Sequence, residues 1–224
     1  MPRRTKPGRS GAQGKRDGRR PKAVGKRGEG GPLSEIERTL EDLTAVLDRL
    51  DVPAAVIGGI AVIAWGFGRS TIDVDAAVAL GTKKLPALLK QLTKAGFEPR
   101  IDGAVAFARE SMVLLMKHSQ TGVAVDVSLA QLDFEEEALR NAVDRPFGAV
   151  TIRVPRATDL VAYKMFAARP RDLQDVEELV ARGLDIDFHR VESLMLGFDA
   201  LLGFDRAGDW RRLLARLKAG QRSD

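Results

Sequence analysis

The chain has 224 residues, 44% of them hydrophobic and 30% charged, so it can bury a core and is not disordered throughout. It contains no cysteine, and its two histidines, His118 and His189, lie far apart, which excludes disulfides, thiol nucleophiles and thiolate metal sites. No apolar run in the sequence approaches the roughly 20 residues needed to span a bilayer. We therefore expect a cytoplasmic protein with no membrane partner, in which any metal would take oxygen ligands.

The charge is divided unevenly between residues 1–31 and the remainder. The first 31 residues hold eleven of the 36 Lys and Arg but only two of the 31 acids, a net charge of +9, against −4 for residues 32–224. This segment is rich in glycine and almost free of apolar residues, so we expect a disordered basic tail. It lacks the apolar stretch of a secretory signal. Its basic residues would bind nucleic acid or another polyanion; a solubilising tail and a start codon placed too early are the alternatives.

Hydrophobic periodicity predicts the secondary structure from residue 32 onward. Ser34 followed by Glu37 is a capping-box signature for the first helix. A tight turn is expected at Gly58-Gly59, directly after a short apolar strand. In chain order we expect a helix over about 34–50, a strand over 54–57, a short helix over 60–67, a strand over 72–80, a helix over 84–95, two or three strands across 104–117 and 123–129, a helix over 133–142, a strand over 150–154, and helices over 158–168, 172–181, 188–202 and 208–218.

This order of elements, with strands and helices mixed at first and helices alone at the end, predicts an α+β fold. We expect a disordered tail over 1–31 and a core over 32–155, in which a small mixed β-sheet is flanked by helices. Residues 156–224 are expected to form a C-terminal helical subdomain.

Three aspartates indicate chemistry that depends on oxygen ligands. Asp73 and Asp75 are two residues apart in the strand expected over 72–80, so their carboxylates share one face. Such carboxylates repel each other unless a cation lies between them, and Mg²⁺ prefers one or two carboxylates together with substrate phosphates. Asp126 is a lone acid in the apolar strand that follows. If the two strands are neighbours, Asp126 completes a site for two metal ions about 3.5–4 Å apart.

Gly58 and Gly59 precede a short predicted helix, where backbone amides can approach a triphosphate. Each of these features also has a simpler explanation. A glycine pair most often only marks a turn, and an Asp-x-Asp pattern on a strand is usually a solvated face. Asp126 could equally serve as the partner of an arginine.

The residues around the first two aspartates resemble a known signature. Gly58-Gly59 followed by Arg69-Ser70-Thr71-Ile72-Asp73-Val74-Asp75 resembles the motif of the DNA polymerase beta-like nucleotidyltransferase superfamily, and within it the AbiEii-type branch of toxin-like nucleotidyltransferases. A second segment, Asp159–Lys164 and then Arg169–Val176, is similar to the Lys-x-x-Ala and Arg-x-x-Asp helices of that branch. The resemblance covers about residues 34–182 and implies the nucleotidyltransferase fold.

The resemblance also implies an activity, the transfer of a nucleoside monophosphate from a triphosphate such as ATP to a hydroxyl of RNA, protein or a small molecule. Asp73, Asp75 and Asp126 would be catalytic residues and ligands of two Mg²⁺ ions, and Asp126 would draw a proton from the acceptor hydroxyl. The nucleotide-binding residues that it implies are Gly58, Gly59, Arg69, Thr71, Lys164, Asp172 and Asp175.

Several of these roles have structural alternatives. Lys164 would otherwise be a surface lysine on an amphipathic helix, Arg69 a salt-bridge partner, and Asp172 an acid that complements the dipole of its helix. The chain also departs from the superfamily pattern, because Gly59 is followed by Ile60 where many members have serine. The aromatic content of 5% leaves no evident base-stacking platform.

Two other functions compete with the enzyme. A nucleic-acid-binding or partner-binding protein on a degenerate nucleotidyltransferase scaffold would bind through residues 1–31 and consume no triphosphate. A structural, antitoxin-like partner would associate stably with a second chain, just as a toxin-like enzyme would have a cognate antitoxin.

Overall fold

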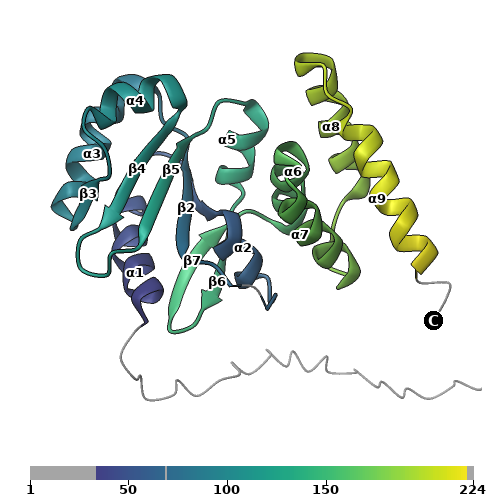
Figure 1. Ribbon diagram of the computed structural model, residues 1–224, viewed down its shortest axis with the longest axis horizontal. Coiled ribbons are helices and arrows are strands. Elements are labelled where there is room, and N and C mark those ends of the chain that lie inside the picture. Colours follow the sequence, from purple (N-terminus) through teal and green to yellow (C-terminus); the bar gives the residue numbers. More distant parts are fainter. Residues whose placement is uncertain (1–33, 69, 221–224) are drawn as a thin grey trace, which may run out of the picture. The chain divides into compact units, whose positions relative to one another are not determined.

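The computed structural model describes residues 34–68 and 70–220; Figure 1 shows them as a coloured ribbon. The predicted tail over 1–31 lies outside the described residues. The elements in chain order are α1 Glu35–Leu47, β1 Ala54–Ile57, α2 Gly58–Ala64, β2 Asp73–Val78, the 3-10 turn η1 Thr82–Lys84, α3 Leu85–Lys94, β3 Phe97–Pro99, α4 Ala104–Ser111, β4 Val113–His118, β5 Ala124–Leu129, α5 Asp133–Arg140, β6 Val143–Phe147, β7 Val150–Val154, α6 Ala157–Ala167, α7 Pro170–Ala181, α8 Phe188–Leu202 and α9 Arg206–Gly220.

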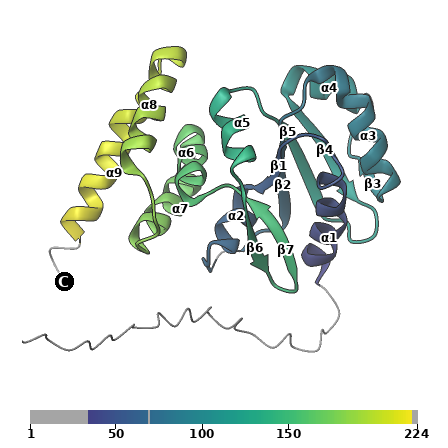
Figure 2. The same ribbon diagram turned by 180° about the vertical axis from the view of Figure 1, so that it is seen from behind.

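Within the described residues, five strands form one mixed sheet with the order β1-β2-β5-β4-β3, and β6 pairs with β7 in a separate hairpin. β2 and β5 run parallel, whereas the other neighbours in the large sheet are antiparallel. A parallel pair needs a crossover connection. Here the segment of chain that connects β2 to β5 forms α3, β3, α4 and β4 (Figures 1 and 2). This arrangement confirms the predicted α+β class.

Alternation along β2 and β5 divides the large sheet into an apolar face and a polar face. The apolar side chains are buried and belong to the main core together with leucines of α1 and α3. Burying each such side chain contributes about 1.5–3 kcal/mol, so these residues decide which face turns inward. The residues of the two strands that belong to the main core on this face are Val74, Ala76, Val78, Val125, Val127 and Leu129.

The start of α1 has the capping box that its sequence predicts. The Ser34 hydroxyl accepts from the Glu37 backbone N–H, and the Glu37 carboxylate accepts from the Ser34 N–H at 2.8 Å. The same carboxylate accepts from the Ala149 N–H at 2.7 Å. Hydrogen bonds from Ser34 and Ala149 lower the pKa of Glu37, and they join α1 to the turn between β6 and β7.

Residues 104–111 contradict the strand expected there, because they form helix α4. Ala104 and Ala108 are both buried and lie one helical turn apart, and alanine favours the helix over the strand. The structure also contains β3 and β6, two strands that the sequence pattern did not predict. Each includes a proline, Pro99 or Pro146, a residue that interrupts the strand pattern and is tolerated mainly at edges.

Helices α6 to α9 follow the hairpin, as predicted for the C-terminal part. The described residues belong to one compact unit, so the boundary between 155 and 156 stays a prediction. Buried side chains of these helices, including Leu160, Val176 and Trp210, belong to the same core cluster as the sheet. Among the described helices, none has the length and apolar character to span a membrane.

Candidate active site

The glycine pair lies where β1 runs directly into α2. Gly58 has a φ of 65°, in the left-handed region where glycine carries no steric cost. A Cβ on Gly58 would overlap the carboxylate of Asp75. Helix α2 begins at Gly58, so the tight turn predicted before the helix is absent at this position. The missing side chain of Gly58 leaves space for the Asp75 carboxylate on the neighbouring strand.

The three predicted aspartates lie together on the polar face of the sheet. Asp75 is directly opposite Asp126 in the parallel pairing of β2 with β5, and Asp73 is two residues earlier on β2. Residues opposite each other in a ladder point to the same face, as the sequence analysis required. We refer to Asp73, Asp75 and Asp126 as the acid cluster.

The acid cluster carries negative charge that its surroundings compensate only in part. Burial raises the pKa of Asp75, and the charges of Asp73 and Asp126 raise it further, while Lys164 and Arg169 act in the opposite direction. A raised carboxyl pKa means that the ionised form is disfavoured where it stands. A bound cation would relieve this cost.

Hydrogen bonds fix the loop that leads into β2. The Thr71 hydroxyl donates to the Asp73 carboxylate at 2.7 Å, so Thr71 orients one member of the acid cluster. The Arg171 guanidinium, from the first turn of α7, donates to the Ser70 carbonyl at 2.6 Å. Arg69, predicted to bind nucleotide, lies outside the described residues.

Asp126 has a partner that sequence reasoning did not identify. The Arg100 guanidinium forms a salt bridge with the Asp126 carboxylate, and each side chain is about one third exposed, at 33% and 38%. Burial raises the pKa of Asp126, the Arg100 charge lowers it, and the Asp73 charge raises it. An arginine partner was one of the alternatives for Asp126, but nothing in the sequence singled out Arg100.

Lys164 is buried between two acids. Its Nζ donates to Asp172 Oδ1 at 2.8 Å, and it lies 2.9 Å from Asp175 Oδ2. The side-chain exposures of all three residues are 12% or less, which contradicts the surface-lysine alternative. We refer to Lys164, Asp172 and Asp175 as the lysine cluster. It joins α6 to α7 across Ala168, a non-glycine residue with a φ of 47°.

One cleft of about 860 Å³ brings the predicted residues together. Arg169, Arg171 and Tyr163, which the site prediction did not include, also line it. Asp175 is not among its lining residues, although it belongs to the lysine cluster. The predicted residues that line the cleft are Gly58, Gly59, Thr71, Asp73, Asp75, Asp126, Lys164 and Asp172.

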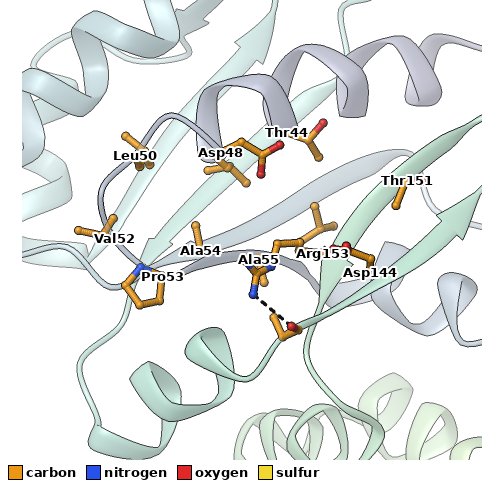
Figure 3. A pocket seen from close by; sticks show the side chains of 13 residues that line it. Thr44, Asp48, Leu50, Val52, Pro53, Ala54, Ala55, Asp144, Thr151 and Arg153 are labelled. Carbon is orange, nitrogen blue, oxygen red and sulfur yellow. Dashed lines mark hydrogen bonds between the residues drawn. The ribbon is translucent and has the colours of Figure 1, made fainter.

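A second hollow, of about 630 Å³, lies between the end of α1, strand β1 and the β6–β7 hairpin (Figure 3). Its polar side chains include Asp48, Asp144 and Arg153, and the Arg153 guanidinium donates to the Ala142 carbonyl at 3.1 Å. None of the predicted site residues that the structure describes lines this hollow.

The acid cluster offers carboxylate oxygens, the donors that Mg²⁺ prefers. Its charge excess and the raised pKa of Asp75 are consistent with a cation at this position. Across residues 34–68 and 70–220, no three acid or histidine side chains are already arranged as a metal site. The carboxylates of the acid cluster are thus the donor type that a divalent cation takes, and the predicted two-ion arrangement stays a prediction.

Comparison with known proteins gives a consistent result. Residues 32–216 match the family described as nucleotidyltransferase of unknown function (DUF6036). No curated protein matches the chain significantly.

Solved structures also resemble the chain. The solution structure of the antibiotic-resistance factor ANT(2'')-Ia is 14% identical, with a TM-score of 0.51 over 86% of this chain and 100% of that one. A nucleotidyltransferase-like protein from Paracoccidioides brasiliensis is 17% identical, with a TM-score of 0.47 over 79% and 92% of the two chains. The lincosamide adenylyltransferase LnuA, bound to lincomycin, is 12% identical, with a TM-score of 0.42 over 62% and 94%. At such identities, the likeness to ANT(2'')-Ia shows the fold alone.

Proposed function

The chain belongs to the family of nucleotidyltransferases of unknown function (DUF6036), and we propose that it transfers a nucleoside monophosphate from a triphosphate to an acceptor hydroxyl with the aid of Mg²⁺. The observation that carries this proposal is the acid cluster. Asp75 faces Asp126 across the parallel strands, with Asp73 on the same face, in the cleft that also contains Lys164. Family membership gives the reaction class, and the cleft supplies residues suited to it.

Asp73 and Asp75 would hold the cation, with Asp126 as a further ligand. When bound, Mg²⁺ would neutralise the charge that builds up on the leaving pyrophosphate. Thr71 keeps the Asp73 carboxylate oriented through its hydrogen bond. Gly58 leaves the space that the Asp75 carboxylate occupies. These residues of the chain therefore prepare the donor set before any substrate arrives.

The transfer joins the acceptor oxygen to the α-phosphorus, and the bond from that phosphorus to the pyrophosphate breaks. Asp126 would take the proton of the acceptor hydroxyl. Burial raises its pKa, and a carboxylate with a raised pKa is the stronger base. Lys164 and Arg169 line the same cleft and would place positive charge beside the phosphates.

The experiment supplies the purified chain with each labelled ribonucleoside triphosphate, Mg²⁺ and, separately, cellular RNA, protein and small-molecule fractions. We expect label to appear in one fraction with the release of pyrophosphate, which would name the nucleotide and the acceptor class together. The Asp73→Asn variant should lose at least about a hundredfold in rate. Asp51→Asn, which replaces an exposed acid before β1, is the matched control and should keep full activity.

Two results would overturn the proposal. One is an Asp73→Asn variant as active as the control. The other is no consumption of any triphosphate by a folded protein that still binds nucleic acid, which would favour the binding-protein alternative. The narrower assignment to the AbiEii-type toxin-like branch, with a cognate antitoxin as partner, adds the expectation that a second chain co-purifies with this one and suppresses its transfer activity.

A further inference from the structure

Arg100 lies at the edge of the sheet formed by β3, and its side chain contacts the acid cluster. It follows the short strand β3, and its backbone N–H donates to the Leu115 carbonyl at 3.0 Å. Leu115 in turn lies directly opposite Asp126, and Asp126 lies opposite Asp75. Arg100, Leu115, Asp126 and Asp75 thus form one row across β3, β4, β5 and β2, and the Arg100 side chain crosses β4 to meet the Asp126 carboxylate.

The contact places a positive charge directly on one carboxylate of the acid cluster. The Arg100 guanidinium donates to Asp126 Oδ1, at the edge of the cleft. A guanidinium neutralises a carboxylate by donating to its oxygen lone pairs. Arg100 contacts Asp126 Oδ1, so a divalent cation that uses this oxygen would have to displace the guanidinium, and at the other oxygen it would meet the repulsion of the Arg100 charge.

We infer that Arg100 stands in for a divalent cation at Asp126 and competes with it. The inference rests on the proposed function, since it assumes that the acid cluster binds such a cation. Without nucleotide, Arg100 occupies an oxygen of Asp126 and weakens cation binding there. Arrival of the triphosphate with its cation releases Arg100. The Arg100 side chain is one third exposed and precedes the turn over 101–103, so it has room to move away from Asp126. Salt bridges between groups this exposed are weak, so the exchange is easy.

The test measures Mn²⁺ binding to the full chain in the absence of nucleotide, from the paramagnetic resonance signal of the free ion. Arg100→Gln removes the competing charge, and we expect it to bind Mn²⁺ about tenfold more tightly than the unaltered chain, as a unit charge within about 5 Å of a divalent ion in water would produce. Arg38→Gln breaks an exposed salt bridge with Glu41 on α1 and is the matched control, with no change expected. In Arg100→Gln combined with Asp126→Asn, the gain should disappear.

The outcomes separate the inference from the proposed function. Asp75→Asn should weaken Mn²⁺ binding in every background; if it does not, both the cation site and the competition at it are refuted. If Asp75→Asn weakens binding while Arg100→Gln leaves it unchanged or weakens it, Arg100 orients Asp126 and does not compete, so the inference alone is wrong. Circular dichroism of each variant establishes that it is folded.

Discussion

The acid cluster lines the same cleft as Lys164 and Asp172 of the lysine cluster, and the two clusters differ in how their carboxylates are paired. Lys164 lies within 3 Å of the carboxylates of Asp172 and Asp175, and all three are buried. The acid cluster has three carboxylates, and among the described residues Arg100 forms a salt bridge with one of them, Asp126, at the exposed edge. Buried charges persist in proteins when they are paired. The lysine cluster therefore contributes to holding α6 against α7, whereas Lys164, Arg169 and Arg100 compensate the charge of the acid cluster only in part.

The largest expected effect on stability concerns the lysine cluster. Lys164→Met removes the cation that contacts two buried carboxylates and should lower the free energy of unfolding by about 3–5 kcal/mol. Urea denaturation followed by circular dichroism measures it. Lys117→Met is the matched control, because Lys117 is half exposed and lies 3.9 Å from Glu98; a change within about 0.5 kcal/mol is expected there. Equal midpoints for the two variants would mean that the lysine cluster does not stabilise the fold.

Gly58→Ala tests the space that the acid cluster requires. The new Cβ would be strained at a φ of 65° and would overlap the Asp75 carboxylate, so we expect a loss of about 2–4 kcal/mol in the free energy of unfolding. Gly203→Ala separates the two causes, because Gly203 has a φ of 70° but no atom within 4 Å of the added Cβ. It should lose only the conformational part, about 1–2 kcal/mol. If both variants lose the same amount, Asp75 does not constrain Gly58.

Asp75→Asn should remove the activity but stabilise the protein, whereas Lys164→Met is expected to destabilise it. Because the pKa of Asp75 is raised in the folded state, folding favours its protonated form, and stability falls as the pH rises from the ordinary carboxyl range through the raised pKa. The variant lacks this loss, so its advantage should grow across that interval and then stay constant. We expect a gain of about 2–4 °C in Tm at neutral pH.

Thermal unfolding at a series of pH values measures this effect, with Asp51→Asn as the exposed control. A variant less stable than the unaltered chain at neutral pH would show that the acid cluster is compensated in the folded protein, and the comparison with the lysine cluster would fail.

The smallest effect concerns the orientation of one acid. Thr71→Val removes the hydroxyl that donates to Asp73 at 2.7 Å and keeps a similar side-chain volume. A hydrogen bond of this kind contributes about 1 kcal/mol, so we expect a loss of roughly fivefold in kcat/KM with little change in Tm. Thr71→Ser, which keeps the hydroxyl, should retain the activity. If Val and Ser variants are equally active, Asp73 does not depend on Thr71.

The sequence pattern predicted that the three aspartates lie on polar strand faces, because the alternation of residues along a single strand is enough to show this. Asp73 and Asp75 alternate with valine and alanine on one strand, and Asp126 is the lone acid of another, so strand geometry alone puts each on a polar face. That the two strands are parallel neighbours in this register could only come from the fold. Arg100 could not be found, because it follows a three-residue strand that contains proline and has no periodicity.

The lysine cluster shows a different limit of sequence reasoning. Asp172 and Asp175 lie eight and eleven positions after Lys164, on the next helix, and meet it only because the chain reverses at Ala168. A positive φ is usually indicated by glycine, and here the residue is alanine, so the sequence did not reveal the reversal. The resemblance implied a nucleotide-binding role for these three residues, but not that Lys164 is buried and paired with both acids. The helix over 104–111 was missed because its short alternation of alanine with larger residues fits a strand equally well.

The in-register pairing of Asp75 with Asp126 has a consequence for how this protein tolerates change. Moving β5 by a single position would turn Asp126 inward and expose Val125 and Val127, because strand side chains alternate with a period of two. The packing of the aliphatic residues on the buried face of the sheet thus sets the alignment of the three aspartates on the other face, for which we propose a catalytic role. Substitutions that loosen their packing, though far from any substrate, should erode catalysis before they unfold the chain.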